Sequence, residues 1–144
     1  MDPRPVLVFF YGSYMNRAVL AEIGLSPALW EPASLSGFDI RIAPRGNLVR
    51  APGHIVFGVL AAATHAELDR LYTHAQTVLG ETYLPEAVLV RTQTGAWHPT
   101  LCYIATDMKP APPEAAYVGR ILEPARELAF PAWYIERLES FLAR

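Results

Sequence analysis

The feature that most constrains the fold is an apolar run, Val6 to Phe10, that ends at Tyr11-Gly12-Ser13. The run has no polar alternation, so it predicts a strand that is buried on both faces. Gly12 lets the backbone turn directly after the strand, because no Cβ restricts its conformation. Amides at such a turn, beside a helix N-terminus, point outward and hold a carboxylate or an oxyanion. The turn is therefore the candidate ligand site, and a plain strand-to-helix turn is the alternative.

Composition indicates one globular domain spanning 1–144, with 52% hydrophobic and 18% charged residues. The formal net charge of -2 argues against a nucleic-acid partner, because such proteins carry a basic excess or a dense basic face. No apolar stretch is long enough for a signal peptide or a membrane span, so no membrane partner is expected. The nearest approach to a basic patch is formed by four arginines, of which most are expected to be solvated and one available to an anionic ligand: Arg41, Arg45, Arg50 and Arg91.

The single cysteine, Cys102, lies in an apolar segment without a partner, which favours a reducing compartment and a cytoplasmic protein. It is expected to be a small core residue rather than a nucleophile. The four histidines are scattered, and no pair has the spacing of metal ligands. No phosphate-binding glycine loop is present either. We therefore expect neither a metal nor a cofactor.

The remaining sequence alternates strand and helix patterns irregularly, which favours an α+β fold over a doubly wound sheet. Gly58 lies inside an apolar strand and marks a bulge or a close backbone approach. Residues 43–53 are rich in proline and glycine and are expected to form a loop. Pro124 and Pro131 are expected to divide the C-terminal region into short helices. The expected strands are 6–10, 35–42, 55–61, 88–92 and 97–105, and the expected helices are 17–23, 65–79, 113–122 and one from residue 132.

Several segments, taken in order, resemble the gamma-glutamylcyclotransferase family and its AIG2-like relatives. The segments cover nearly the whole chain, and their joint order and spacing is more specific than any one of them. They are Phe10-Tyr11-Gly12-Ser13, Val56-Phe57-Gly58-Val59-Leu60, Leu68-Asp69, Tyr83 before Val88-Leu89-Val90, Ala111-Pro112-Pro113 and Phe130-Pro131-Ala132-Trp133-Tyr134.

The resemblance implies a small mixed β-barrel flanked by short helices, with a substrate pocket at its mouth. It also implies a transferase or lyase that releases 5-oxoproline, because the substrate's α-amine attacks its own γ-carbonyl. Such a reaction needs an anchored α-carboxylate, a stabilised γ-oxygen and a carried proton. Amides from Tyr11 to Tyr14 suit the first two needs, and by resemblance Tyr83 and Tyr134 line the pocket. An ordinary half-buried tyrosine is the alternative for both residues.

The chain departs from the family pattern at the catalytic glutamate, which commonly follows the Leu-Asp pair. Tyr72 stands at the expected position, and a phenol is a poor base at neutral pH. One hypothesis moves the carboxylate to Glu81, two residues before Tyr83, and the alternative is that Glu81 is a solvated loop charge. Glu86 and Glu127 are weaker candidates with no motif behind them. A second departure is Tyr14-Met15 in place of Asn-Leu, which narrows or reshapes the pocket.

Two functions from different classes follow. The first is a gamma-glutamylcyclotransferase-like enzyme acting on a small gamma-glutamyl amine or peptide, with Glu81 as acid and base. The second is a module on the same fold that binds a small anionic ligand, or another protein, without catalysis. A carboxylate within hydrogen-bonding reach of a ligand on the Gly12 and Ser13 amides favours the enzyme, and a pocket without a carboxylate favours binding. Monomer and homodimer both stay open.

Overall fold

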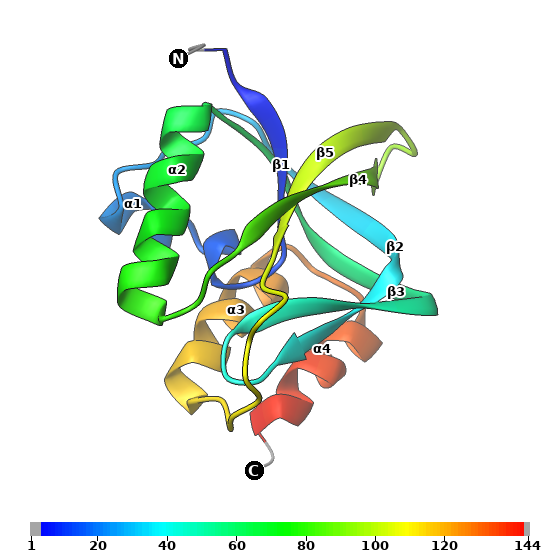
Figure 1. The fold of residues 1–144 in the computed structure, drawn as a ribbon. Helices are drawn as coiled ribbons and strands as arrows, with labels where there is room; N and C mark the ends of the chain where they lie inside the picture. Colours follow the sequence, from blue (N-terminus) through cyan, green and yellow to red (C-terminus); the bar gives the residue numbers. More distant parts are fainter. Residues whose placement is uncertain (1–3, 143–144) are drawn as a thin grey trace.

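The computed structural model describes residues 4–142, and its five strands close into a barrel in the order β1-β3-β2-β4-β5. Four helices pack around this barrel (Figure 1). This confirms the predicted α+β class and the small mixed barrel flanked by short helices. The elements are β1 Val6–Phe10, α1 Arg17–Glu22, β2 Trp30–Ile42, β3 Gly46–Ala63, α2 His65–His74, β4 Leu84–Thr92, β5 Trp97–Ile104, α3 Ala115–Glu127 and α4 Ala132–Glu139, with short helical turns at Ser13–Met15, Ala75–Leu79 and Ser140–Leu142.

Strand β1 closes the barrel, because it pairs antiparallel with β3 and parallel with β5. Phe9 lies opposite Leu60 on one side and opposite Cys102 on the other. Neighbours on both edges and packing on both faces leave Val8, Phe9 and Phe10 at most 1% exposed. The uninterrupted apolar run therefore forms a strand that is buried on both faces, as the sequence predicts.

The expected loop over residues 43–53 is wrong, because β3 begins at Gly46 and only three residues connect it to β2. Backbone pairing continues to the tip of this hairpin, where Ile40 opposes Leu48 and Ile42 opposes Gly46. Only residues 51–54 interrupt the pairing, opposite Gly37. The proline and glycine of this stretch thus mark a bulge in a long hairpin rather than a loop.

Gly58 confirms the predicted close approach of two backbones. A Cβ built on Gly58 would lie 2.3 Å from the Phe10 carbonyl oxygen and 2.7 Å from Cζ of Phe9. Only glycine lets β3 pack this closely against β1.

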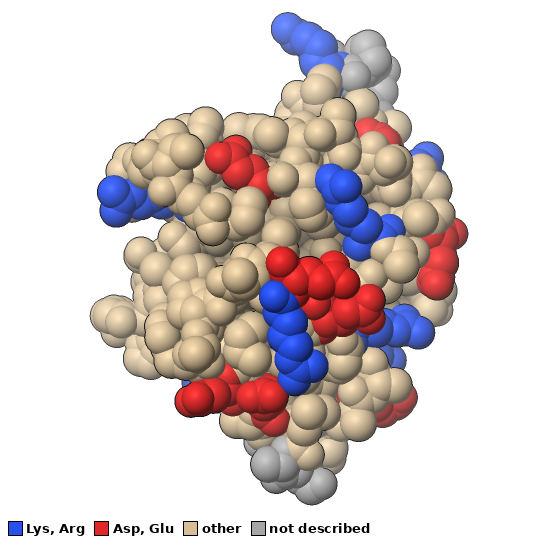
Figure 2. All heavy atoms as spheres, turned by 180° about the vertical axis from the view of Figure 1, so that it is seen from behind, with Lys and Arg blue, Asp and Glu red and all other residues tan. Residues whose placement is uncertain are grey.

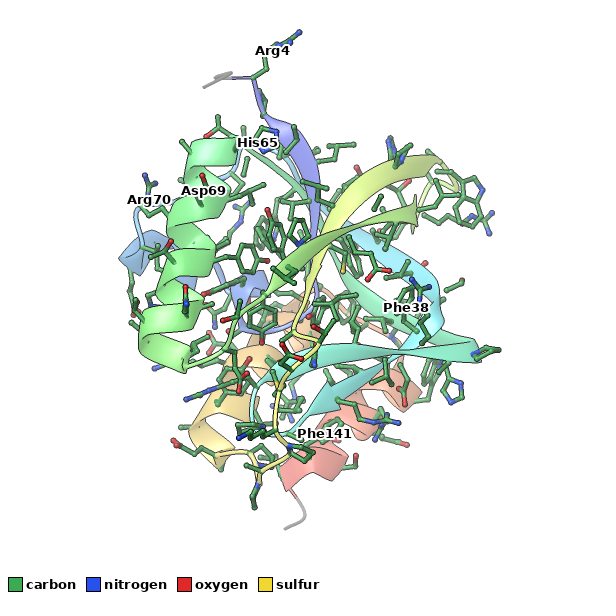
Figure 3. All side chains as sticks on the ribbon, viewed as in Figure 1. Arg4, Phe38, His65, Asp69, Arg70 and Phe141 are labelled. Atoms are coloured by element: carbon green, nitrogen blue, oxygen red, sulfur yellow. The ribbon has the colours of Figure 1, made fainter. Side chains whose placement is uncertain are left out.

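The helix termini follow the sequence signals at α1 and α2. Asn16 caps α1 by accepting a hydrogen bond from the Ala18 amide at 3.0 Å. Thr64 and Glu67 form a capping box that begins α2, with N···O distances of 2.9 and 3.1 Å. Figure 3 shows Asp69 and Arg70 on the outer side of α2, where Arg70 donates hydrogen bonds to carbonyls that follow α1.

Pro124 does not end a helix, in contrast to the prediction, because α3 continues through it to Glu127. Proline lacks the amide that would bond to the carbonyl four residues earlier, which belongs to Arg120. The Asn16 side-chain amide donates a hydrogen bond to that carbonyl at 3.3 Å. A partner from outside the helix thus replaces the missing intrahelical bond.

Figure 2 shows charged side chains of both signs interspersed on one face of the molecule. Within residues 4–142, four arginine-carboxylate ion pairs form. Among residues 4–142, no helix is long and apolar enough to cross a membrane.

Candidate functional site

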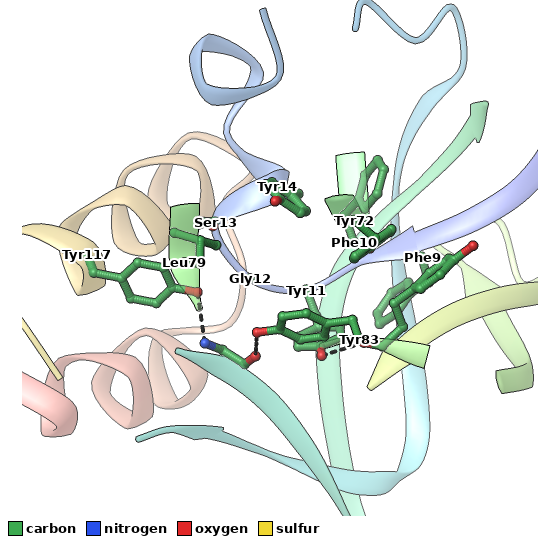
Figure 4. Close-up of a pocket in the computed structure, with 12 residues that line it drawn as sticks. Phe9, Phe10, Tyr11, Gly12, Ser13, Tyr14, Tyr72, Leu79, Tyr83 and Tyr117 are labelled. Atoms are coloured by element: carbon green, nitrogen blue, oxygen red, sulfur yellow. Dashed lines mark hydrogen bonds between the residues drawn. The ribbon is translucent and has the colours of Figure 1, made fainter. Parts of the chain in front are cut away.

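A small pocket with a cavity volume of about 30 Å³ lies where the turn after β1 meets the tip of the β2–β3 hairpin and the end of α2 (Figure 4). Its walls are mainly aromatic, with phenol hydroxyls and glycine backbone as the polar groups. The lining residues are Phe9, Phe10, Tyr11, Gly12, Ser13, Tyr14, Gly46, Tyr72, Leu79, Tyr83, Tyr103 and Tyr117. The structure therefore brings together five of the predicted binding residues: Tyr11, Gly12, Ser13, Tyr14 and Tyr83.

The turn itself presents backbone amides to this pocket. Its short helical segment begins at Ser13, and the Met15 amide donates to the Gly12 carbonyl at 3.0 Å. Amides at the start of a helical turn have no acceptor inside the turn. The Ser13 amide lies beside the Tyr117 hydroxyl and helps lower its pKa, so the Tyr14 amide is the donor of this turn that remains for a bound anion.

Tyr117 joins the turn to the hairpin tip, although the sequence reasoning did not single it out. Its hydroxyl accepts a hydrogen bond from the Gly46 amide at 2.8 Å, while Tyr83 donates to the Gly46 carbonyl at 2.5 Å. The backbones of Gly46 and Gly12 pack so closely that a Cβ on Gly46 would lie 3.4 Å from the Gly12 Cα. Burial raises the pKa of Tyr117, and the nearby amide and hydroxyl of Ser13 oppose that rise. Its oxygen therefore lies among donors from both loops.

The hydroxyls of Tyr11 and Tyr14 also contact backbone carbonyls. Tyr11 donates to the Tyr103 carbonyl at 2.7 Å. The hydroxyl oxygen of Tyr14 lies 3.2 Å from the Leu71 carbonyl oxygen and 3.0 Å from Nδ1 of His74. Burial raises the pKa of both phenols well above the ordinary value of 10.0, so both are neutral at physiological pH.

Tyr72, which the sequence resemblance sets at the expected position of the glutamate, lies in the pocket wall. Its ring stacks on Tyr103 at 3.8 Å between centroids and meets Tyr14 edge-on at 5.7 Å. Burial raises the pKa of Tyr72 well above 10.0, which removes it as a base near neutral pH.

None of the lining residues carries a carboxyl group. Glu81 follows the end of the α2 region and is not part of the lining, although its charge helps raise the pKa of Tyr83 after the larger effect of burial. Glu86 pairs with Arg50 on the surface, and Glu127 lines a different hollow. The structure thus places no acid or base of the carboxyl type in the pocket.

Tyr134, the remaining predicted binding residue, is not part of this pocket. It is 1% exposed and packs against Phe57, Phe130 and Trp133 at centroid distances of 5.1, 6.0 and 5.7 Å. Its buried hydroxyl has no hydrogen-bond partner. Tyr134 therefore belongs to an aromatic core on β3 and α4.

Metal and thiol chemistry find no support in the part of the chain that the structure describes. No group of three or more histidine, cysteine, aspartate or glutamate side chains is arranged to hold a metal ion there. Cys102 is fully buried, and burial together with the charge of Glu86 raises the pKa of its thiol to about 12. It is the core residue that the sequence predicts.

The barrel fold and the sequence together place the chain in a known family. The model of the AIG2-like family matches residues 55–138, more than half of the chain, and the chain belongs to this family. A search of curated protein sequences gives no match.

Three solved structures illustrate the relationship. A human protein described as uncharacterized protein loc79017 superimposes with a TM-score of 0.83 at 25% identity, over 95% of this chain and 88% of the other. A protein named gamma-glutamyl cyclotransferase gives 0.81 at 25% identity, over 94% and 87% of the two chains. A yeast gamma-glutamyl cyclotransferase described as specific to glutathione gives 0.64 at 13% identity over 97% and 96%, which shows the common fold alone.

Proposed function

We propose that this protein binds the γ-glutamyl part of a small molecule in the aromatic pocket. The observation that carries the proposal is the loop junction at Gly12 and Gly46, where the backbones of two loops pack together on one side of an aromatic cavity. The likeness to a protein named gamma-glutamyl cyclotransferase supports the choice of ligand.

The wall chemistry fits such a ligand. The Tyr14 amide suits the α-carboxylate, because a backbone donor at a turn favours a negative charge. The aliphatic chain of a glutamyl group would pack on the rings of Phe10 and Tyr72. Phenols that stay neutral do not repel the carboxylate.

The missing carboxylate supports binding without turnover. Cyclisation requires the substrate ammonium to lose a proton, and that proton must then reach the leaving amine. By the sequence resemblance, Tyr72 stands at the position expected for the group that does this task, and burial raises its pKa. The lining offers no other acid or base of the carboxyl type.

Cyclisation with release of 5-oxoproline is the second candidate, and the electrostatic coupling of Glu81 to Tyr83 favours it. In this reaction the pocket would fold the substrate so that its amine approaches its own γ-carbonyl. A small movement of the segment after Leu79 would have to bring the Glu81 carboxylate to the ligand.

Calorimetric titration with a panel of γ-glutamyl compounds tests the binding function, and an assay for 5-oxoproline tests the reaction. We expect saturable binding by the wild type without release of 5-oxoproline. Failure of every γ-glutamyl compound to bind would refute the proposed function.

A matched pair of variants separates the two candidates. E81Q removes the carboxylate whose charge acts on the pocket residue Tyr83, and E127Q removes one at a different hollow. Release of 5-oxoproline that disappears in E81Q and persists in E127Q would establish the second candidate.

A further inference from the structure

The pocket is smaller than the ligand proposed for it. Its cavity volume of about 30 Å³ is close to the volume that one water molecule takes up in the liquid. Pockets that enclose a small-molecule ligand usually measure about 300–1,000 Å³. One wall of the pocket must therefore move before a γ-glutamyl compound can enter.

Most walls of the pocket are tied to one another by hydrogen bonds. The tip of the β2–β3 hairpin is held at Gly46 by bonds with the hydroxyls of Tyr83 and Tyr117. Beside it, the side chain of Asn47 exchanges two hydrogen bonds with the backbone of Ala105, at 2.7 and 3.0 Å. The turn after β1 is held to β5 by a further bond of 2.7 Å. These walls can separate only if several such bonds break.

The wall formed by Leu79 is held differently, because Leu79 belongs to the segment that follows α2 (Figure 4). We call residues 76–82 the lid. Within residues 4–142, the hydrogen bonds of the lid return to α2 or to Ala75 directly after it, and none joins the lid to another element. Only Leu79 and Glu81 are half-buried in the lid, and its other side chains are exposed, with Val78 at 63%. The lid therefore rests on the protein mainly through Leu79.

Two backbone features suit this segment to movement. The end of α2 continues as a π-helical turn, Ala75–Leu79, and turns of this kind are rare and often lie at functional sites. Gly80 follows with a φ of 78°, in the left-handed region that favours glycine. A Cβ on Gly80 would meet no atom within 4 Å, so the cost of a side chain there comes from the backbone conformation alone. Gly80 thus has the properties of a hinge.

We propose that the lid opens about Gly80 to admit ligand and that Leu79 closes the pocket in the conformation described here. The inference rests on the proposed binding function for the identity of the ligand, whereas the movement itself belongs to the free protein. The lid also carries Glu81. Its position therefore decides whether that carboxylate comes within reach of a bound ligand.

A thiol inside the pocket reports the movement without any ligand. S13C places one there, because Ser13 lines the pocket and is 6% exposed. The native Cys102 is fully buried, and burial raises the pKa of its thiol to about 12, so iodoacetamide reacts with it only after unfolding. We expect alkylation of S13C to be about tenfold or more faster than that of Cys102. It should be about tenfold or more slower than that of V78C, whose thiol lies on the exposed side of the lid.

Two changes in the lid should open it when they are combined with S13C. L79A removes the side chain that closes the pocket and should accelerate alkylation by about tenfold or more. G80A disfavours the left-handed conformation and should accelerate it by about tenfold as well. V78A is the matched control, because Val78 belongs to the same lid but does not line the pocket. It should change the rate by less than about twofold.

Three results would overturn the lid. They are alkylation of S13C at the rate of Cys102, alkylation at the rate of V78C, and a rate that neither L79A nor G80A changes. The rate at Cys102 in each variant measures any general loss of stability, so a destabilised protein is not mistaken for an open lid.

Hydrogen exchange of the wild type tests the lid without any variant. Amides of the lid should exchange about tenfold or more faster than those of α2, and equal protection of the two segments would overturn the lid. Neither measurement needs a ligand. Lid movement in a protein that binds no γ-glutamyl compound would therefore refute the binding function and leave the lid standing.

Discussion

Two aromatic regions contain a buried tyrosine, and they differ in the hydrogen bonds that the phenols make. In the pocket, Tyr11, Tyr83 and Tyr117 each hydrogen-bond to backbone of another segment. In the second region, defined by Tyr134, Phe57, Phe130 and Trp133 and called the Tyr134 cluster below, aromatic rings surround the phenol and its hydroxyl has no partner. Both regions bury aromatic surface, but only the pocket combines it with loop backbone.

The comparison teaches that backbone at loop tips, rather than tyrosine itself, creates the site. A phenol packed between strand and helix meets backbone groups already paired with each other, so its hydroxyl stays unpartnered. A phenol beside a turn and a hairpin tip meets free amides and carbonyls. Carboxylates are placed differently in the two regions. Asp39 lies near the Tyr134 cluster, where Arg41 and Arg137 pair with it, whereas the pocket lining contains no carboxylate.

The largest loss of stability is expected for G58A, because the substitution affects both regions. Gly58 follows Phe57 of the Tyr134 cluster and faces Phe9 and Phe10 of the pocket. Its Cβ would lie 2.3 Å from a carbonyl oxygen, so strands β1 and β3 must separate. We expect a loss of about 3 kcal/mol in the free energy of unfolding, measured by urea denaturation.

G119A is the control for this prediction, because a Cβ on Gly119 in α3 meets no atom within 4 Å. It should raise stability by up to about 1 kcal/mol, as expected for alanine in a helix. Equal stability of G58A and wild type would show that the close approach of the strands is dispensable.

Y117F removes the acceptor of the Gly46 amide and should cost about 1–3 kcal/mol, because a buried donor loses its partner. The hairpin tip would no longer be tied to α3, so affinity for γ-glutamyl ligands should fall as well. Urea denaturation and calorimetric titration of the same variant measure the two effects. Unchanged ligand affinity would separate the hairpin tip from the binding site.

D39N tests the charges near the Tyr134 cluster. Burial raises the pKa of Asp39, but hydrogen bonds and charges from Arg41 and Arg137 outweigh it, so the net pKa is lower than 3.8. A carboxyl group whose pKa is lower in the folded state stabilises the protein at any pH above its unfolded-state pKa. That stabilisation is lost as the pH falls through the folded-state pKa. The free energy of unfolding of the wild type should therefore exceed that of D39N by less than about 1 kcal/mol at neutral pH.

Urea denaturation at neutral pH and at about pH 2 checks this prediction, because the carboxyl group takes up a proton as the pH falls through its pKa. The difference between D39N and wild type should shrink at the lower pH. A difference that is constant across pH would assign the effect of the variant to packing.

Y134F should have the smallest effect, within about 0.5 kcal/mol of wild type, because the hydroxyl that it removes has no hydrogen-bond partner. The Phe57 backbone lies near enough to lower the pKa of Tyr134 against the larger rise from burial. Y117F is the matched comparison, since the same atom is removed from a bonded site. A loss in Y134F as large as that in Y117F would remove the distinction between the two regions.

Local signals predicted much of the fold. The uninterrupted run before Gly12, the capping box at Thr64 and the glycine at position 58 each have one dominant physical cause, and each is confirmed. The two errors arose where distant partners overrode a local signal. Strand β2 pairs with residues 46–50, and Asn16 supplies the bond that Pro124 removes from α3.

The site residues predicted from the sequence are those of one continuous turn, together with Tyr83, which the family resemblance supplied. The turn from Tyr11 to Tyr14 contributes consecutive residues, and the family resemblance locates it. Gly46 and Tyr117 come from segments far along the chain, and no motif marks either of them. The one available signal was a tyrosine on the apolar face of α3, four residues before Ile121, since a buried phenol usually requires a polar partner.

The bond between Asn16 and Arg120 has a consequence for the order of events during synthesis. The turn that follows β1 is made first, yet its neighbour Asn16 finds its partner 104 residues later, and Tyr11 finds its partner 92 residues later. Contacts of such separation form late, because a long loop must close before they contribute. A nascent chain that lacks α3 would therefore contain the residues of the turn without their folded conformation. A ligand of this turn would stabilise only the final stage of folding.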